Sequence, residues 1–249
     1  MIGEKMEENT RINPEDFKNA AIEAIYCWNR TEYFYHKYFS KLDELYKNKY
    51  LRQFFTDKIF ETFLREYSIR RNISAGYKKV DMFIDEIIEM KFVKYIKSGN
   101  VDAIDCISQQ LKDSERSTNR ETKSLLSKIA FLINPNDFSL YDSICKKSVG
   151  QLMNNCGFYR GKYIDNYSNY IVGVNCLLYD YSKILEQNIE ILKILRETSA
   201  NKYLLENPGA YKRRILDKYL WLYQQKQNIN ARPISNKAFR EFLKYNVLS

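Results

Sequence analysis

The sequence predicts an all-α protein of about ten to twelve helices without an internal repeat. Three observations support this fold class. The 249 residues contain only eight Gly and four Pro, too few for the many hairpins of a β-sandwich or barrel. No segment alternates apolar and polar residues with the two-residue period of a strand. Apolar residues instead recur three and four positions apart, and a hydrophobic content of 45% suffices for a buried core.

The N-terminal elements follow from caps and apolar stripes. Residues 1–12 are polar, and the sequence Asn13-Pro14-Glu15-Asp16 then predicts a helix start, with Asn as cap and acids at the positive end of the helix dipole. An apolar stripe continues this helix to about Trp28. Two further helices are expected at 32–48 and 51–68, and their many Tyr and Phe residues are expected in the core.

A long helix is expected from about residue 77 to 97, where Ser98-Gly99-Asn100 ends it, and a short one at 101–111. The polar segment 112–123 then predicts a loop or an exposed helix start. We place the candidate domain boundary there, between an N-terminal helical layer (1–112) and a basic helical half (113–249). A single continuous domain is the alternative.

The segment Ser124–Gly150 organises the rest of the chain. It predicts an apolar helix that Asn134-Pro135 stops, an apolar turn, and a second helix that opens at Tyr141-Asp142-Ser143. Asp142 or Ser143 is a natural N-cap there, because a short side-chain oxygen can accept a hydrogen bond from a first-turn N–H. Lys146 and Lys147 follow on the same helix.

The C-terminal part continues with a glycine-flanked basic loop, 154–162, and further helices. Tyr163, Tyr167 and Tyr170 follow this loop on one helical face, where they would either stack on bases or pack in the core. An amphipathic helix or helix pair is expected at 172–198. Clear helical periodicity marks 210–227, and a short last helix is expected at 236–245.

The charge distribution favours a polyanionic partner. The formal net charge is +9; residues 1–142 hold 23 basic and 23 acidic residues, whereas residues 143–249 hold 17 and 8. All of the excess therefore lies in the second part of the chain, as expected for nucleic-acid binding. Charge that merely aids solubility is the alternative.

Several classes of function are disfavoured. Five widely spaced cysteines and the single histidine, His36, do not form the ligand pattern of a zinc or iron–sulfur site, so we expect buried free thiols, no metal and no cofactor. His36 is expected to pack rather than act as a base. The sequence shows no membrane span or signal peptide, which predicts a cytoplasmic protein without a membrane partner.

Part of the central segment resembles a known superfamily. The stretch Phe138-Ser139-Leu140-Tyr141-Asp142-Ser143 with the basic tail Lys146-Lys147 is similar to the catalytic segment of helix-hairpin-helix DNA glycosylases. The late sequence Leu216-Asp217-Lys218-Tyr219-Leu220-Trp221 is similar to helical proteins that share such a turn. The resemblance implies a glycosylase-like fold in the second half. It also implies that Asp142 corresponds to the catalytic aspartate and Lys128 to the catalytic lysine of that superfamily.

Two classes of function follow. In the first, the chain binds DNA, rather than RNA, on a glycosylase-like scaffold for DNA repair, either with base excision by Asp142 and Lys128 or without catalysis. In the second, it is a non-catalytic helical interaction or regulatory protein of a defence or mobile-element system. The oligomeric state is left open. The candidate nucleic-acid contacts are Lys146, Lys147, Tyr159, Arg160, Lys162 and Tyr163.

Overall fold

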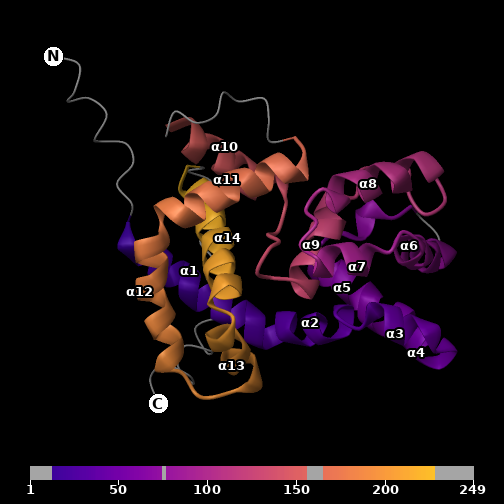
Figure 1. The fold of residues 1–249 in the computed structure, drawn as a ribbon, viewed down its shortest axis with the longest axis horizontal. Coiled ribbons are helices and arrows are strands. Elements are labelled where there is room, and N and C mark those ends of the chain that lie inside the picture. Colours follow the sequence, from indigo (N-terminus) through magenta and orange to yellow (C-terminus); the bar gives the residue numbers. More distant parts are fainter. Residues whose placement is uncertain (1–12, 75–76, 156–164, 228–249) are drawn as a thin grey trace. The chain divides into compact units, whose positions relative to one another are not determined.

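The computed structural model describes residues 13–74, 77–155 and 165–227 (Figure 1). These residues form helices joined by turns and contain no strand, so the all-α prediction is confirmed. The chain divides into two compact units. Unit 1 comprises residues 1–28, 143–164 and 173–249, and unit 2 comprises residues 29–142 and 165–172. The domain boundary expected near residue 112 stays a prediction; residue 112 itself lies inside unit 2.

Unit 1 is organised around the helix α14, Pro208–Gln227, against which most of the other helices of the unit pack. The aromatic ring of Phe17 stacks on Tyr219 at 4.0 Å between centroids, and the Trp28 indole donates a hydrogen bond to the Ala200 carbonyl at 3.1 Å. The remaining helices are α1 (Pro14–Cys27), α10 (Ser143–Asn155), α12 (Ser182–Lys193), α13 (Ser199–Glu206) and the C-terminal part of α11 (Tyr167–Asp180).

Unit 2 surrounds the buried helix α9, Lys123–Ile133, which packs against α2, α7 and α8. A cluster of buried aromatic residues, among them Phe39, Phe60 and Phe63, packs between the N-terminal helices of this unit. The other elements are η1 (Trp28–Glu32) after its first residue, α2 (Tyr33–Phe39), α3 (Leu42–Lys47), α4 (Lys49–Phe54), η2 (Phe55–Phe60), α5 (Glu61–Glu66), η3 (Arg70–Asn72), α6 (Tyr77–Glu89), α7 (Phe92–Lys97), α8 (Ala103–Ser114) and the N-terminal part of α11.

Several expected boundaries are confirmed. The Asn13 side chain caps α1 by accepting a hydrogen bond from Glu15 N–H, and Pro14 occupies the first turn. Gly99 ends α7 with a φ of 74°, which suits glycine because it has no Cβ. Helix α9 ends at Ile133, directly before Asn134-Pro135, and α10 begins at Ser143.

Other boundaries differ from the expectation. The prediction of one long helix at 77–97 is wrong. The chain breaks at Lys91, which lies between α6 and α7 and has a left-handed backbone with a φ of 56°. The helix expected at 32–48 is likewise divided, into α2 and α3, at residues 40–41. Of the two forms expected for 172–198 the pair is correct, and Tyr181 separates α11 from α12. The helix expected at 236–245 lies outside the described residues.

Candidate functional site

Lys128 lies inside unit 2 on α9. Its side chain is only 6% exposed, and the ammonium donates hydrogen bonds to the Ser124 hydroxyl at 3.0 Å and the Ser124 carbonyl at 3.3 Å. A buried lysine is uncommon, because burial disfavours its charge. The two hydrogen bonds to Ser124, one turn earlier in the same helix, offset part of the free-energy cost of burying the ammonium.

The linker, which we define as residues 138–142 between α9 and α10, is held at three consecutive residues. The Tyr167 hydroxyl accepts a hydrogen bond from Ser139 N–H at 3.0 Å and donates one to the Ser139 carbonyl at 2.8 Å. The Tyr170 hydroxyl donates to the Leu140 carbonyl at 2.7 Å, and Tyr141 N–H donates to the Ser127 hydroxyl at 3.1 Å. The linker backbone that leads to Asp142 is therefore fixed by side chains from α9 and α11.

Tyr167 and Tyr170 do not offer rings for base stacking, since both are 0% exposed. Of the two roles considered for this row of tyrosines, core packing is the one the structure shows for these two. The ring of Tyr141 meets them edge to face, at 5.9 Å from Tyr167 and 5.1 Å from Tyr170. Burial in this cluster raises the pKa of the Tyr141 hydroxyl to about 12, and the carboxylate of Asp165 adds to the effect.

The start of α11 is fixed by Asp105 from α8. Its carboxylate accepts hydrogen bonds from Tyr167 N–H at 2.8 and 2.9 Å and from Ser168 N–H at 3.1 Å. These amides belong to the first turn of α11, where a carboxylate is favoured by the helix dipole. Lys123 at the start of α9 forms an ion pair with Asp105 at 3.2 Å. Asp105 thus positions the helix whose tyrosines hold the linker.

The structure brings the segments of Lys128 and Asp142 together. The hydrogen bond between Ser127 and Tyr141 joins the two residues that precede them in the sequence. Asp142 is half-buried and stands directly before Ser143, the first residue of α10. Along α10, Lys146 is half-buried and Lys147 is exposed. Tyr159, Arg160, Lys162 and Tyr163 lie outside the described residues.

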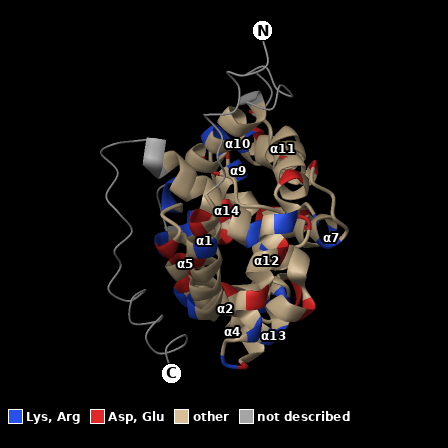
Figure 2. Ribbon diagram, turned by 90° about the vertical axis from the view of Figure 1, so that its left-hand side faces the viewer, with Lys and Arg blue, Asp and Glu red and all other residues tan. Residues whose placement is uncertain are grey.

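Many described basic residues of the second part of the chain are paired with carboxylates. Acidic and basic residues are interspersed along these helices (Figure 2). Lys193 pairs with Glu190 at 2.8 Å, Lys212 with Glu186 at 3.0 Å and Lys218 with Glu23 at 2.9 Å. Lys202–Glu206 and the buried Arg214–Asp217 are further pairs. These five cations are therefore engaged with carboxylates of unit 1.

A different basic surface, which the sequence reasoning missed, lies on unit 2. A hollow of about 340 Å³ is lined by Lys47 of α3, by Lys94 of α7 and by Lys91, which joins α6 to α7; we call it the lysine hollow. Asp43, Tyr46 and Ile88 complete its lining. These lysines belong to the part of the chain that has no net charge, so the charge count could not indicate them.

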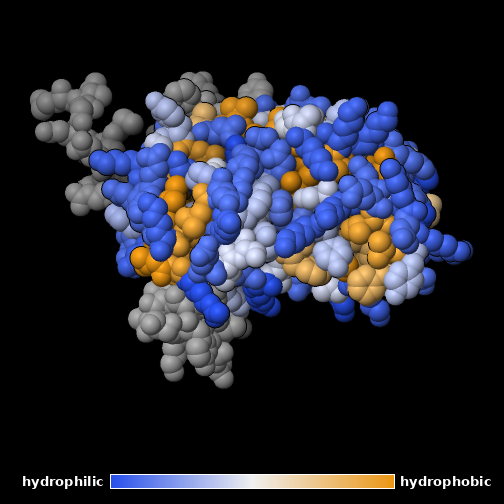
Figure 3. All heavy atoms as spheres, turned by 60° about the horizontal axis from the view of Figure 1, so that its bottom comes forward, coloured by the Kyte–Doolittle hydropathy of each residue, from blue (hydrophilic) through white to orange (hydrophobic). Residues whose placement is uncertain are grey.

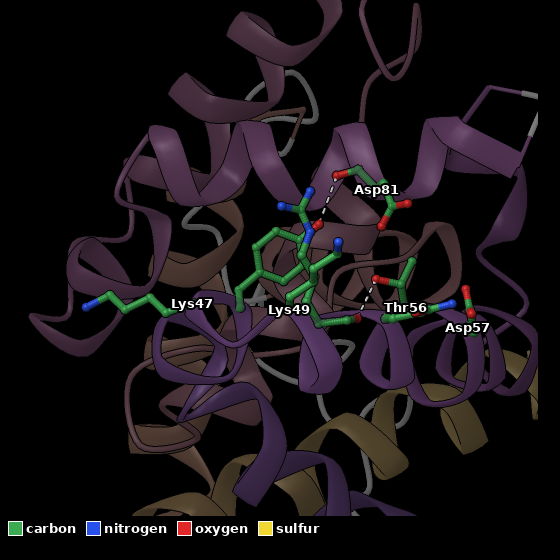
Figure 4. Close-up of a pocket in the computed structure, with 8 residues that line it drawn as sticks. Lys47, Lys49, Thr56, Asp57 and Asp81 are labelled. Carbon is green, nitrogen blue, oxygen red and sulfur yellow. Dashed lines mark hydrogen bonds between the residues drawn. The ribbon is translucent and has the colours of Figure 1, made fainter.

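An adjoining hollow of about 650 Å³ shares Tyr46 and Lys47 with the lysine hollow. Figure 4 shows Lys49, Thr56 and Asp57 on one side of it and Asp81, from α6, on the other. Arg52 lies 4.2 Å from the centre of the Tyr46 ring and donates two hydrogen bonds to Asp85, at 2.8 and 2.9 Å. Arg52 is thus engaged with protein groups, which leaves the lysines as the cations of this region.

Exposed aromatic side chains occur on the same helices. Tyr50 is 78% exposed and Phe54 is 47% exposed, four residues apart on α4. Figure 3 shows hydrophobic side chains among hydrophilic ones on the side where Figure 1 places α3 and α4. Aromatic rings beside lysines are typical of surfaces that bind nucleic acids.

The cysteines differ in part from the expectation of buried thiols. Cys145 is buried, and its thiol lies 3.3 Å from Asp217 Oδ1, whereas Cys27 and Cys176 are half-buried. Cys106 is exposed, because it lies on the outer face of α8, where it lines a surface hollow. Cys156 lies outside the described residues. No group of three His, Cys, Asp or Glu in the described part of the chain is arranged to hold a metal ion.

His36 lies in the first part of unit 2, and its Nδ1 is 2.8 Å from the Leu132 carbonyl of α9. Burial lowers the pKa of its imidazole. This position agrees with a packing role. Among the described helices, none has both the length and the apolar character that crossing a membrane requires.

Comparison of the chain with protein-family models, with curated proteins and with solved structures finds no match. The function is therefore inferred from the residues and their geometry.

Proposed function

We propose that the chain is a DNA-binding protein that presents the carboxylate of Asp142 to the bound nucleic acid at the start of α10. The observation that carries this proposal is the fixed linker: hydrogen bonds hold residues 139, 140 and 141 immediately before Asp142. The backbone of Asp142 is therefore fixed before a ligand arrives, and binding does not have to bear the entropy cost of ordering it.

The surroundings of Asp142 suit a polyanion. The N-terminal end of a helix carries a partial positive charge, and Lys146 and Lys147 lie within the first turns of α10. The helix N-terminus and these two lysines attract the phosphate groups of DNA. The carboxylate of Asp142 repels phosphate and is therefore suited to contact a sugar or a base. The excess of basic residues in 143–249 supports the same partner.

Base excision is the second candidate function, and the position of Asp142 favours it. A glycosylase flips a nucleotide from the duplex and places a carboxylate where positive charge develops on the sugar as the glycosidic bond breaks. Asp142 has the required side chain on a fixed backbone. For Lys128 a role as nucleophile stays a prediction; the structure shows its ammonium hydrogen-bonded to Ser124 within its own helix.

The substitution Asp142→Asn separates the two functions. We expect it to keep the helix start, because Asn and Asp cap helices about equally well, and to keep or strengthen DNA binding by removing a negative charge. If Asp142 is catalytic, base release should fall by about 100-fold or more. The measurement compares wild type and variant on duplex and single-stranded oligonucleotides with modified bases, scoring both binding and abasic sites.

Asp137→Asn is the matched control, since it changes an exposed carboxylate five residues earlier in the same segment. It should leave both readouts unchanged. Equal base release by Asp142→Asn and wild type would exclude a catalytic role for Asp142. Binding without base release in any of the three proteins would leave DNA binding as the function and remove base excision.

A further inference from the structure

The lysine hollow has a strongly positive lining. Lys47, Lys91 and Lys94 are all exposed, and Lys97 lies near enough to act electrostatically on Asp43. Asp43 is the single carboxylate of the lining, and burial raises its pKa against the opposing effect of Lys97 and Lys47. Converging charges of one sign in a concave surface strengthen the local potential and attract ions of the opposite sign.

The three lysines are also available. Within the described part of the chain, none of them forms an ion pair, in contrast to Lys193, Lys212 and Lys218 of unit 1. An unpaired surface lysine keeps its donors for a ligand and releases counterions when a phosphate binds. These three lysines of unit 2 are therefore available to bind a polyanion.

Lys91 occupies an unusual backbone position in this lining. Its φ of 56° places it in the left-handed region, where glycine is the ordinary residue and where a side chain costs about 1 kcal/mol. The turn it forms joins α6 to α7 and sets its side chain on the hollow with Lys94. Ser68 and Glu115 adopt the same left-handed conformation at the ends of other helices, so the backbone at Lys91 places this side chain on the hollow but does not by itself assign it a role.

We propose that the lysine hollow is a phosphate-binding site for the nucleic-acid backbone, with Lys47, Lys91 and Lys94 as its contacts. This inference rests on the proposed function and adds a second contact region to it. Lysine acts on phosphate as a point charge and reads no base, so the site contributes affinity without sequence specificity.

The test compares two triple variants with wild type. The first, Lys47→Ala/Lys91→Gly/Lys94→Ala, removes the three lysines, and glycine at position 91 suits the left-handed backbone. The control, Lys193→Ala/Lys202→Ala/Lys212→Ala, removes the same charge from lysines that are already ion-paired. Binding of a labelled DNA duplex is measured by fluorescence anisotropy between about 50 and 200 mM salt.

We expect the slope of log K against log salt to become less steep by about 2.7 in the first variant, or 0.9 for each lost phosphate contact. The control should keep the wild-type slope. If both variants keep it while wild type binds DNA, the inference is wrong and the proposed function stands. If wild type itself binds no DNA at low salt, the proposed function fails, and the inference with it.

Two additions keep the result interpretable. Thermal melting by circular dichroism reports whether each variant folds, and the single change Lys94→Glu probes the same hollow should the triple variant not fold. Lys94→Glu is then expected to weaken DNA binding by the same mechanism.

Vesicles containing phosphatidylserine provide a different polyanionic surface. Loss of vesicle binding with unchanged DNA binding would assign the hollow to lipid headgroups and overturn the inference.

Discussion

Tyr167 illustrates how far single residues could be understood from the sequence. Its spacing from Tyr170 places both on one helical face, a pattern that more often packs in a core but that also permits base stacking. The deciding contacts are to the backbone of Ser139 and Leu140, some 30 residues earlier in the chain. No local pattern encodes such partners. The start of α10 directly after Asp142 was predictable from the local stop at Asn134-Pro135 and the pattern Tyr141-Asp142-Ser143, whereas the hydrogen bonds that hold the linker before it were not.

Tyr167→Phe should destabilise unit 2 by about 1–3 kcal/mol, because it removes the hydroxyl that hydrogen-bonds both the N–H and the carbonyl of buried Ser139. Urea unfolding followed by circular dichroism measures the change. Tyr179→Phe is the control, since Tyr179 is 81% exposed and its substitution should change the free energy of unfolding little. Equal stability of the two variants would show that the hydroxyl does not hold the linker.

At the scale of elements, boundaries marked by Asn, Pro or Gly were predictable and the others were not. Asn13-Pro14, Asn134-Pro135 and Gly99 each act through local chemistry, and the structure confirms the starts and ends they predict. The breaks at Lys91 and Tyr181 carry no such residue. No residue type that commonly ends a helix marks them, so the local pattern did not locate them.

Gly173 provides a test of helix packing in unit 1. A Cβ at this position of α11 would lie 2.7 Å from Val149 Cγ1 of α10, which is closer than two carbons can approach. Gly173→Ala should therefore destabilise the protein by about 1–3 kcal/mol despite the higher helix propensity of Ala. In a Val149→Ala background the same change should be neutral or stabilising. Thermal unfolding of the four proteins in this double-mutant cycle measures the coupling; additive effects would contradict the close approach.

At the scale of the whole molecule, composition predicted the fold class but gave only part of the candidate site. The count of charges drew attention to the second part of the chain, where Lys193, Lys212 and Lys218 form ion pairs with carboxylates. Lys47 and Lys91, in contrast, lie in a part without net charge and meet in one hollow only after folding. A sum of charges does not record which of them are paired.

Binding of wild-type protein to duplex DNA as a function of salt tests the central claim most directly. We predict measurable binding at low salt and a linear fall of log K with log salt, with a slope of about −2.7 or steeper, since the proposed lysine hollow would contact three phosphates. No binding at the lowest salt, or an affinity that does not change with salt, would contradict the proposal that this chain binds DNA.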